Sequence, residues 1–329
     1  MTARTLIATA IACLLVPLAF SQQTQQAQQT AEPAAPVETY TVPRNEHGQP
    51  DLQGVWTTVT YTLLERPPGL PLVLGPQQAA GFAQAVYQGS PDNNDPDVDL
   101  FGPPKLFNVK GEYRSSVIVY PEDGRMPFNE RGLEAASHHY FKGDHGFDHP
   151  EERPAVERCL ESWGSPPMRA FMYQLFHAFV QTPDKIVIVS EDMGLARVIH
   201  MDDQEWPDAI RSLEGHSVGH WEGDTLVVET THFRGDIPDR ATIDRPMLIS
   251  ADATVTERFT RVSDDELFYQ YTVDDPYYYT EPWRGEFSFT RDEGGHIYEY
   301  SCHEGNYSMV GALRGERVVE VREELGLNN

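Results

Sequence analysis

The residues with the most reactive side chains lie near the C-terminus, in the stretch YEYSCHEGNYSM at residues 298–309. Histidine changes charge near neutral pH, and a neighbouring glutamate can orient it or transfer a proton itself. The amide of Asn306 and the phenol of Tyr307 can donate hydrogen bonds to a developing oxyanion. The stretch therefore predicts an acid/base site in which His303, Glu304 and Tyr307 are catalytic. The alternative is a polar loop that closes the domain.

A second candidate site is the stretch DDPYYY at residues 274–279. Adjacent carboxylates repel each other, which raises the pKa of one of them, and we assign the resulting acid role to Asp275. The aromatic residues around it could stack on a sugar or an aromatic ring; the alternative is simple packing around a hairpin turn. The residues that we expect to contact a substrate are Trp56, Arg258, Tyr278, Trp283 and Asn306.

Histidine and carboxylate side chains also alternate at His216, His220 and Glu222, which share one face of an extended segment. Two imidazoles and a carboxylate can bind zinc, and His200 or His177 could complete the set. The spacing matches no H-E-x-x-H motif, and a chain with 12 histidines brings some pairs close by chance. We therefore expect no cofactor, and zinc at His216, His220, Glu222 and His200 is the alternative.

Residues 1–21 have the features of a signal peptide: Arg4 supplies a positive charge, an apolar run follows, and the small residue Ser21 precedes the cleavage point. We expect cleavage after Ser21 and a periplasmic or secreted protein. Acylation at Cys13, as in a lipoprotein, is the alternative. No other stretch is long and apolar enough to be expected to span a bilayer.

The acidic composition limits the partners. The chain has 25 Lys and Arg against 51 Asp and Glu, which gives a net charge of −26. Such a surface repels nucleic-acid phosphates and anionic lipids, so we expect neither as a partner. A small-molecule ligand remains as the expected partner, and the sequence predicts no oligomeric state.

Removal of the signal peptide leaves two cysteines, Cys159 and Cys302. An even pair in an oxidising compartment predicts a disulfide between them. Closing so long a loop would remove about 4–5 kcal/mol of unfolded-chain entropy in the simple loop-closure model. Cys302 is therefore interpreted as a structural residue and not as a nucleophile.

The organisation of the chain changes twice. Residues 22–45 are rich in Gln, Ala, Thr and Pro and predict a disordered linker. A single folded domain is expected at residues 46–329, with a loop-rich and helix-rich first part (46–170) and a β-barrel part (171–315). Strand-like runs separated by turn signals dominate the second part, the last of them HIYEYSC. They predict an antiparallel meander, and closure into a barrel would remove its exposed edges.

The alternation within these runs indicates a mixed interior. In TVTERFTRV, the residues Val255, Glu257, Phe259 and Arg261 share one face, so neither face is purely apolar. Mixed inner faces suit a barrel that holds a ligand. A sheet partly covered by the N-terminal segments is the alternative.

Two resemblances support this fold. The GVW at residues 54–56 resembles the G-x-W start of lipocalin-type barrels, in which the tryptophan closes one barrel end. Over residues 50 to about 315, the motifs GHWEGDTLVVETTHF, TVDDP and YEYSCHEGNYSM resemble a family of exported bacterial proteins of unknown function. This resemblance implies export and a shared fold but no particular reaction. The chain departs from the family pattern at His216, where an Asp is usual, and at His177.

Together these features predict an exported, mainly β protein with a calycin-like antiparallel barrel, wrapped by loops and short helices of the first part. The function that we expect is a cofactor-independent acid/base enzyme (a lyase, isomerase or hydrolase). Its substrate would be a small organic molecule, aromatic or sugar-derived, bound in the barrel. The alternative is a non-catalytic carrier or sensor of the lipocalin type.

Overall fold

The computed structural model describes residues 40–89, 102–137, 147–153, 155–202, 206–242, 245–304 and 306–327. The expected signal peptide and the linker up to residue 39 lie outside these ranges, so both stay predictions. Within the described ranges, no helix has the length and apolar character needed to cross a membrane.

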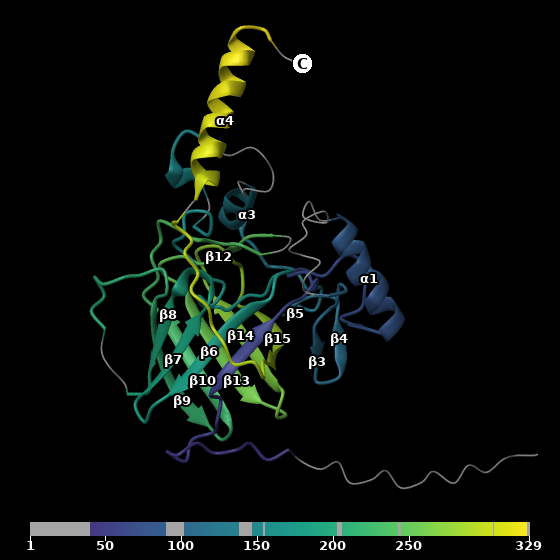
Figure 1. The fold of residues 1–329 in the computed structure, drawn as a ribbon, viewed down its shortest axis with the longest axis vertical. Helices are drawn as coiled ribbons and strands as arrows, with labels where there is room; N and C mark the ends of the chain where they lie inside the picture. Colours follow the sequence, from purple (N-terminus) through teal and green to yellow (C-terminus); the bar gives the residue numbers. More distant parts are fainter. Residues whose placement is uncertain are drawn as a thin grey trace, which may run out of the picture. The chain divides into compact units, whose positions relative to one another are not determined.

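The main sheet closes into a barrel because β1 pairs with both β6 and β15, which confirms the expected fold class (Figure 1). Around the barrel the strands follow in the order β1 (Gly54–Thr58), β6 (Leu175–Gln181), β7 (Lys185–Ser190), β8 (Ala196–His200), β9 (His216–Glu222), β10 (Thr225–Thr231), β13 (Thr254–Arg261), β14 (Glu266–Asp274) and β15 (Trp283–Arg291). The short strand β5 (Ile118–Tyr120) also pairs with β15. Two strands of this sheet, β1 and β5, therefore come from the first part of the domain.

One pair of described barrel strands departs from the expected antiparallel meander: β8 and β9 are parallel, with Ile199 beside Ser217. The reason is the connection at residues 201–215, which returns the chain to the end of the barrel where β8 began. A parallel pair needs such a crossover, whereas a tight hairpin turn can only produce an antiparallel pair.

The last strand-like run, HIYEYSC, is not a strand in the structure. Tyr298 and Tyr300 are 69% and 49% exposed, so their alternation does not reflect a buried face. The strand before them, β15, already pairs with β14 and β1, so closure leaves this run without a place in the barrel. A helix, α4 (Tyr307–Glu324), follows instead.

Aromatic side chains fill the barrel interior. The face of β13 that carries Val255, Glu257, Phe259 and Arg261 is buried, as predicted. The buried side chains of β14 are Leu267, Tyr269, Tyr271 and Val273. The Tyr269 ring centroid lies 4.8 Å from that of Phe259 and 4.9 Å from that of Phe287. Rings of this size bury large areas and account for much of the core.

Smaller elements cover the barrel. A three-stranded sheet of β2 (Val73–Leu74), β4 (Glu112–Arg114) and β3 (Asn108–Val109) lies beside α1 (Pro76–Gly89). The described residues also form α3 (Glu130–Ser137), the 3-10 turns η2 (Pro150–Glu152) and η3 (Asp192–Gly194), and the pair β11 (Asp239–Arg240) and β12 (Met247–Leu248).

Two segments close the barrel end at which β6 begins and β7 ends. The backbone N–H of Met168 donates to the hydroxyl of Tyr269 at 2.8 Å, which ties the segment before β6 to the interior. The N–H of Leu248 donates to the hydroxyl of Tyr279 at 3.0 Å, which ties β12 to the chain after β14. Loops therefore meet over this end, and such loop clusters on a rigid scaffold are common places for function.

Candidate functional site

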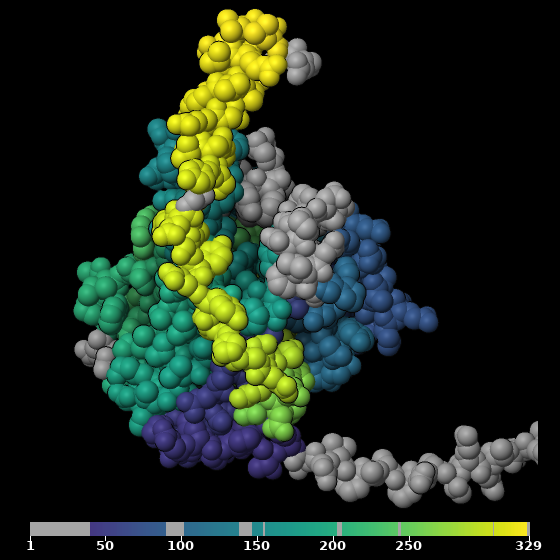
Figure 2. Space-filling view, viewed as in Figure 1, coloured from purple at the N-terminus to yellow at the C-terminus, as the bar shows by residue number. Residues whose placement is uncertain are grey.

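A pocket of about 760 Å³ lies at the barrel end where β6 begins and β7 ends. Its wall is built from the segment before β6 and the start of β6 (residues 156–176), the end of β7 (191–193), residues 241–242 and the C-terminal segment 300–308. Figure 2 shows the C-terminal segment, in yellow, lying along the surface of the teal residues near 150–190. A site of this volume suits a small organic ligand.

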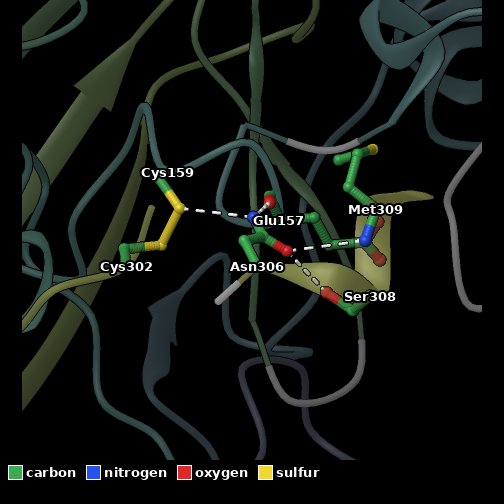
Figure 3. Close-up of a disulfide and its surroundings, with 6 residues drawn as sticks. All are labelled: Glu157, Cys159, Cys302, Asn306, Ser308 and Met309. Atoms are coloured by element: carbon green, nitrogen blue, oxygen red, sulfur yellow. Dashed lines mark hydrogen bonds between the residues drawn. A yellow bond between two sulfur atoms is a disulfide. The ribbon is translucent and has the colours of Figure 1, made fainter. Parts of the chain in front are cut away.

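The C-terminal wall is held by the Cys159–Cys302 disulfide, which confirms the pairing expected from composition (Figure 3). Asn306 strengthens the attachment because its side-chain amide donates to the carbonyl oxygen of Glu157 at 3.1 Å. Its Oδ1 accepts from the N–H of Met309 at 3.4 Å and caps α4. The amide that we expected to serve an oxyanion is therefore already used in holding the chain.

Asp192 is the most deeply buried carboxylate of the pocket wall, at 8% exposure. Its Oδ2 accepts from the N–H of Trp163 at 2.6 Å, while Oδ1 has no hydrogen-bond partner among the described residues. Burial raises the pKa of this carboxyl, and the Trp163 N–H opposes that rise. The next residue, Met193, has a φ of 61°, an unusual backbone conformation for a non-glycine residue that often marks functional sites.

Our sequence reasoning missed Asp192 because it follows the run KIVIVSE and there reads as an ordinary turn residue. The available signal was its position two residues after the end of β7, which places a carboxylate at the end of the sheet.

The predicted catalytic residues do not meet in one place. Glu304 lines the pocket, but His303 is exposed and does not belong to the described lining. Tyr307 is 81% exposed at the start of α4. Asp275 is 1% exposed and is held by Ser250, whose N–H and hydroxyl donate to it at 2.8 and 2.7 Å.

The pKa of Asp275 is raised, as expected, but the main cause differs from the expected one. Burial raises it, and hydrogen bonds from Ser250 and Tyr277 oppose the rise. The neighbouring Asp274 points to the exposed side of the strand, because successive strand residues face opposite ways. The Tyr277 N–H donates to Asp275 at 3.1 Å, so the carboxylate stabilises the turn after β14. Its catalytic role stays a prediction.

Most of the predicted substrate contacts lie in the core or on the outer surface. Trp56 and Trp283 are fully buried, and the indole N–H of Trp56 donates to Leu52 O at 2.8 Å. Tyr278 is 7% exposed, and Arg258 pairs with a carboxylate on the outside of the barrel. Of the five predicted contacts, Asn306 is the one that the described pocket lining includes. The aromatic residue types that suit a binding site are the same ones that fill a barrel core.

The alternative zinc set is not assembled. His220 is exposed and contacts Glu222 at 3.3 Å on the outer face of β9. His216 is buried instead, with its ring 4.5 Å from Trp206 and 5.1 Å from His200. Among the residues that the structure describes, no three His, Cys, Asp or Glu side chains are placed to hold a metal ion.

Polar side chains within the barrel bind one another. The buried Arg197 pairs with Glu257, which also accepts from the Tyr269 hydroxyl at 2.7 Å. Arg197 donates further to Ser217 at 3.0 Å and to Thr230 at 2.9 Å. The mixed interior expected from the sequence is therefore present, and the buried charges of Arg197 and Glu257 are paired with each other.

No family model, no curated protein and no solved structure matches this chain. The resemblance drawn from the sequence motifs therefore stays an expectation. The function has to be argued from the pocket itself.

Proposed function

We propose that the protein is a cofactor-independent acid/base enzyme, a lyase, isomerase or hydrolase, whose small organic substrate binds in the pocket around Asp192. The observation that carries this proposal is a buried carboxyl in the wall of a cavity of about 760 Å³. Perturbed carboxylates in clefts are common at catalytic sites. This proposal keeps the reaction class that the sequence predicted and moves its centre from His303 to Asp192.

The environment of Asp192 suits a proton donor. Burial favours the neutral acid, and efficient acid catalysis needs a group that keeps its proton until the substrate arrives. The Trp163 N–H holds one carboxyl oxygen in place, which limits the side chain to one orientation. Glu304 lines the same pocket and would serve as the second carboxylate, which receives a proton or orients a water.

The test is turnover by the variant Asp192→Asn, which keeps the size of the side chain and removes its proton transfer. The substrates are panels of benzyl glycosides and benzyl esters, whose alkoxide leaving groups need a proton from the acid, and the released benzyl alcohol is measured by chromatography. We expect Asp192→Asn to lower kcat by about 100-fold or more, with KM within a few fold. The matched control is Glu222→Gln, a carboxylate on the outer face of β9.

Two results would contradict the proposal in different ways. If Asp192→Asn keeps kcat close to that of the unchanged protein, Asp192 is not the acid. If the protein retains an organic ligand in native mass spectrometry and returns it chemically unchanged after incubation, the carrier function replaces the enzyme.

A further inference from the structure

The pocket wall combines acidic and aromatic side chains and lacks basic ones. Its described lining includes four carboxylates and no lysine, arginine or histidine. Aromatic rings form part of the same wall, with Trp163 and Phe171 stacked at 4.6 Å and Phe171 5.2 Å from Tyr173. The four carboxylate residues are Glu157, Glu191, Asp192 and Glu304.

These carboxylates differ in how far the protein neutralises them. Glu157 is paired with Arg153 through two contacts of 2.9 Å. Glu191 accepts a backbone N–H from Tyr298 at 2.9 Å, which supplies no formal charge. Glu304 is exposed on the pocket rim and forms no side-chain ion pair with the described residues. Negative charge therefore remains on the wall after the internal pairs are counted.

Asp192 belongs to the same wall, but the protein already surrounds it with hydrogen-bond donors and a cation. It is 8% exposed, and Oδ1, which has no hydrogen-bond partner among the described residues, is itself buried. Burying a carboxylate is costly unless a cation or donor approaches it. The Trp163 N–H and the Ser162 side chain already hydrogen-bond to this carboxyl, and the charge of Arg169 acts on it, so the negative charge offered to a ligand comes mainly from Glu191 and Glu304.

We propose that the pocket binds an organic cation, a small molecule with an ammonium group next to a ring or apolar body. This inference rests on the proposed function because it names the substrate class of the same pocket. A cation over aromatic faces is attracted by the ring quadrupoles, and the surrounding carboxylates add charge attraction. The net charge of −26 raises the local concentration of cations around the protein. An anionic ligand would be repelled by the carboxylates of the wall that no described cation pairs.

Three probes of similar size separate charge from shape: benzylammonium, benzyl alcohol and phenylacetate. Isothermal titration calorimetry on the full mature chain measures their affinities at low and at physiological ionic strength. We expect benzylammonium to bind about tenfold more tightly than benzyl alcohol, and phenylacetate to bind more weakly than both. Glu304→Gln should lower the benzylammonium affinity about threefold to tenfold and leave benzyl alcohol unchanged.

The control variant is again Glu222→Gln, which removes the same charge from the outer face of the barrel. Equal affinities for benzylammonium and benzyl alcohol would overturn the inference. An equal loss in the Glu304 and Glu222 variants would also overturn it, because the attraction would then be a property of the whole surface.

The binding data are independent of turnover and so separate the two proposals. If the protein prefers the cation but Asp192→Asn changes no turnover, the protein binds cations and is not an acid/base enzyme that uses Asp192. If neutral substrates are turned over in a reaction that depends on Asp192, and cations are not preferred, the acid/base enzyme is supported and the organic cation is excluded as its substrate class.

Discussion

The buried His177 should make the protein sensitive to acid, and its replacement should remove a defined part of that sensitivity. His177 lies in β6 at 0% exposure, with Nδ1 2.9 Å from the hydroxyl of Ser190 and its ring packed edge-on against Phe289. Its Nε2 has no hydrogen-bond partner among the described residues. Burial lowers the pKa of His177 from 6.5 to about 3.

The sign of the effect follows from which state binds the proton first. As the pH falls below 6.5, the unfolded chain protonates this histidine while the folded chain does not, so stability is present above pH 6.5 and is lost towards pH 3. The full shift corresponds to about 5 kcal/mol, at about 1.4 kcal/mol for each pKa unit. Between pH 7 and pH 4.5, His177 lowers the free energy of unfolding by about 2.5 kcal/mol.

The variant His177→Asn keeps a polar group near the position of Nδ1 and does not titrate. Urea unfolding followed by tryptophan fluorescence at both pH values gives the loss of stability in each protein. Between pH 7 and pH 4.5, the wild-type protein should lose about 2.5 kcal/mol more unfolding free energy than the His177→Asn variant. The variant will also be less stable at pH 7 because the ring packing is gone, so the comparison uses the change with pH and not the absolute value.

The control variant is His296→Gln, which removes a histidine that is exposed and not buried in the barrel. If His177→Asn and the unchanged protein lose the same stability within about 0.5 kcal/mol, the histidine is not held neutral by burial and the reasoning fails.

Two further changes test the fold. Cys302→Ser breaks the bond to Cys159 across a separation of 143 residues, and the loop-closure model predicts a loss of about 5 kcal/mol. Thermal unfolding without reductant should show the loss, and a melting temperature equal to that of the oxidised protein would contradict it. Gly164→Ala places a Cβ in steric conflict with the Ser190 hydroxyl and should cost about 1–3 kcal/mol in urea unfolding. Gly81→Ala, with open space around it in α1, should stabilise or be neutral, and equal losses in the two variants would refute the steric argument.

The barrel was predictable where the evidence was local. The period of two in TVTERFTRV places Glu257 on the same face as Phe259 and Arg261, and that face is the buried one. A strand pattern alone does not reveal strand order, because order depends on how far the connections reach. The segment between β8 and β9 carries no signal for the barrel end to which it returns, so the parallel pair was not predicted.

The incorrect prediction of a strand at HIYEYSC has the same cause: a local pattern does not show which strands pair. Its residues alternate as well as those of a true strand, but the place beside β15 is taken by β1, which comes from the other end of the domain. Pairing partners at such sequence separation leave no trace in a local pattern. The disulfide between Cys159 and Cys302 was easier to predict, because they are the two cysteines left after removal of the expected signal peptide.

The candidate site was harder to predict than the fold because the same residue types serve both purposes. Trp56 and Trp283 were expected at a ligand and are in the core, where large rings bury the most surface. Asp192 was overlooked because its chemistry depends on burial, and burial is a property of the assembled barrel end.

The pocket lies at the barrel end because the interior is already occupied. Rings and the Arg197–Glu257 pair fill the space between the strands, and the void beside Tyr271 is about 20 Å³, enough for about one water. The proposed ligand is therefore placed where loops meet above the strands, in the larger pocket. One wall there, residues 300–308, adds few buried side chains of its own and depends on the disulfide for its position. Ligand affinity should accordingly depend on the oxidation state of Cys302 even under conditions in which the barrel itself stays folded.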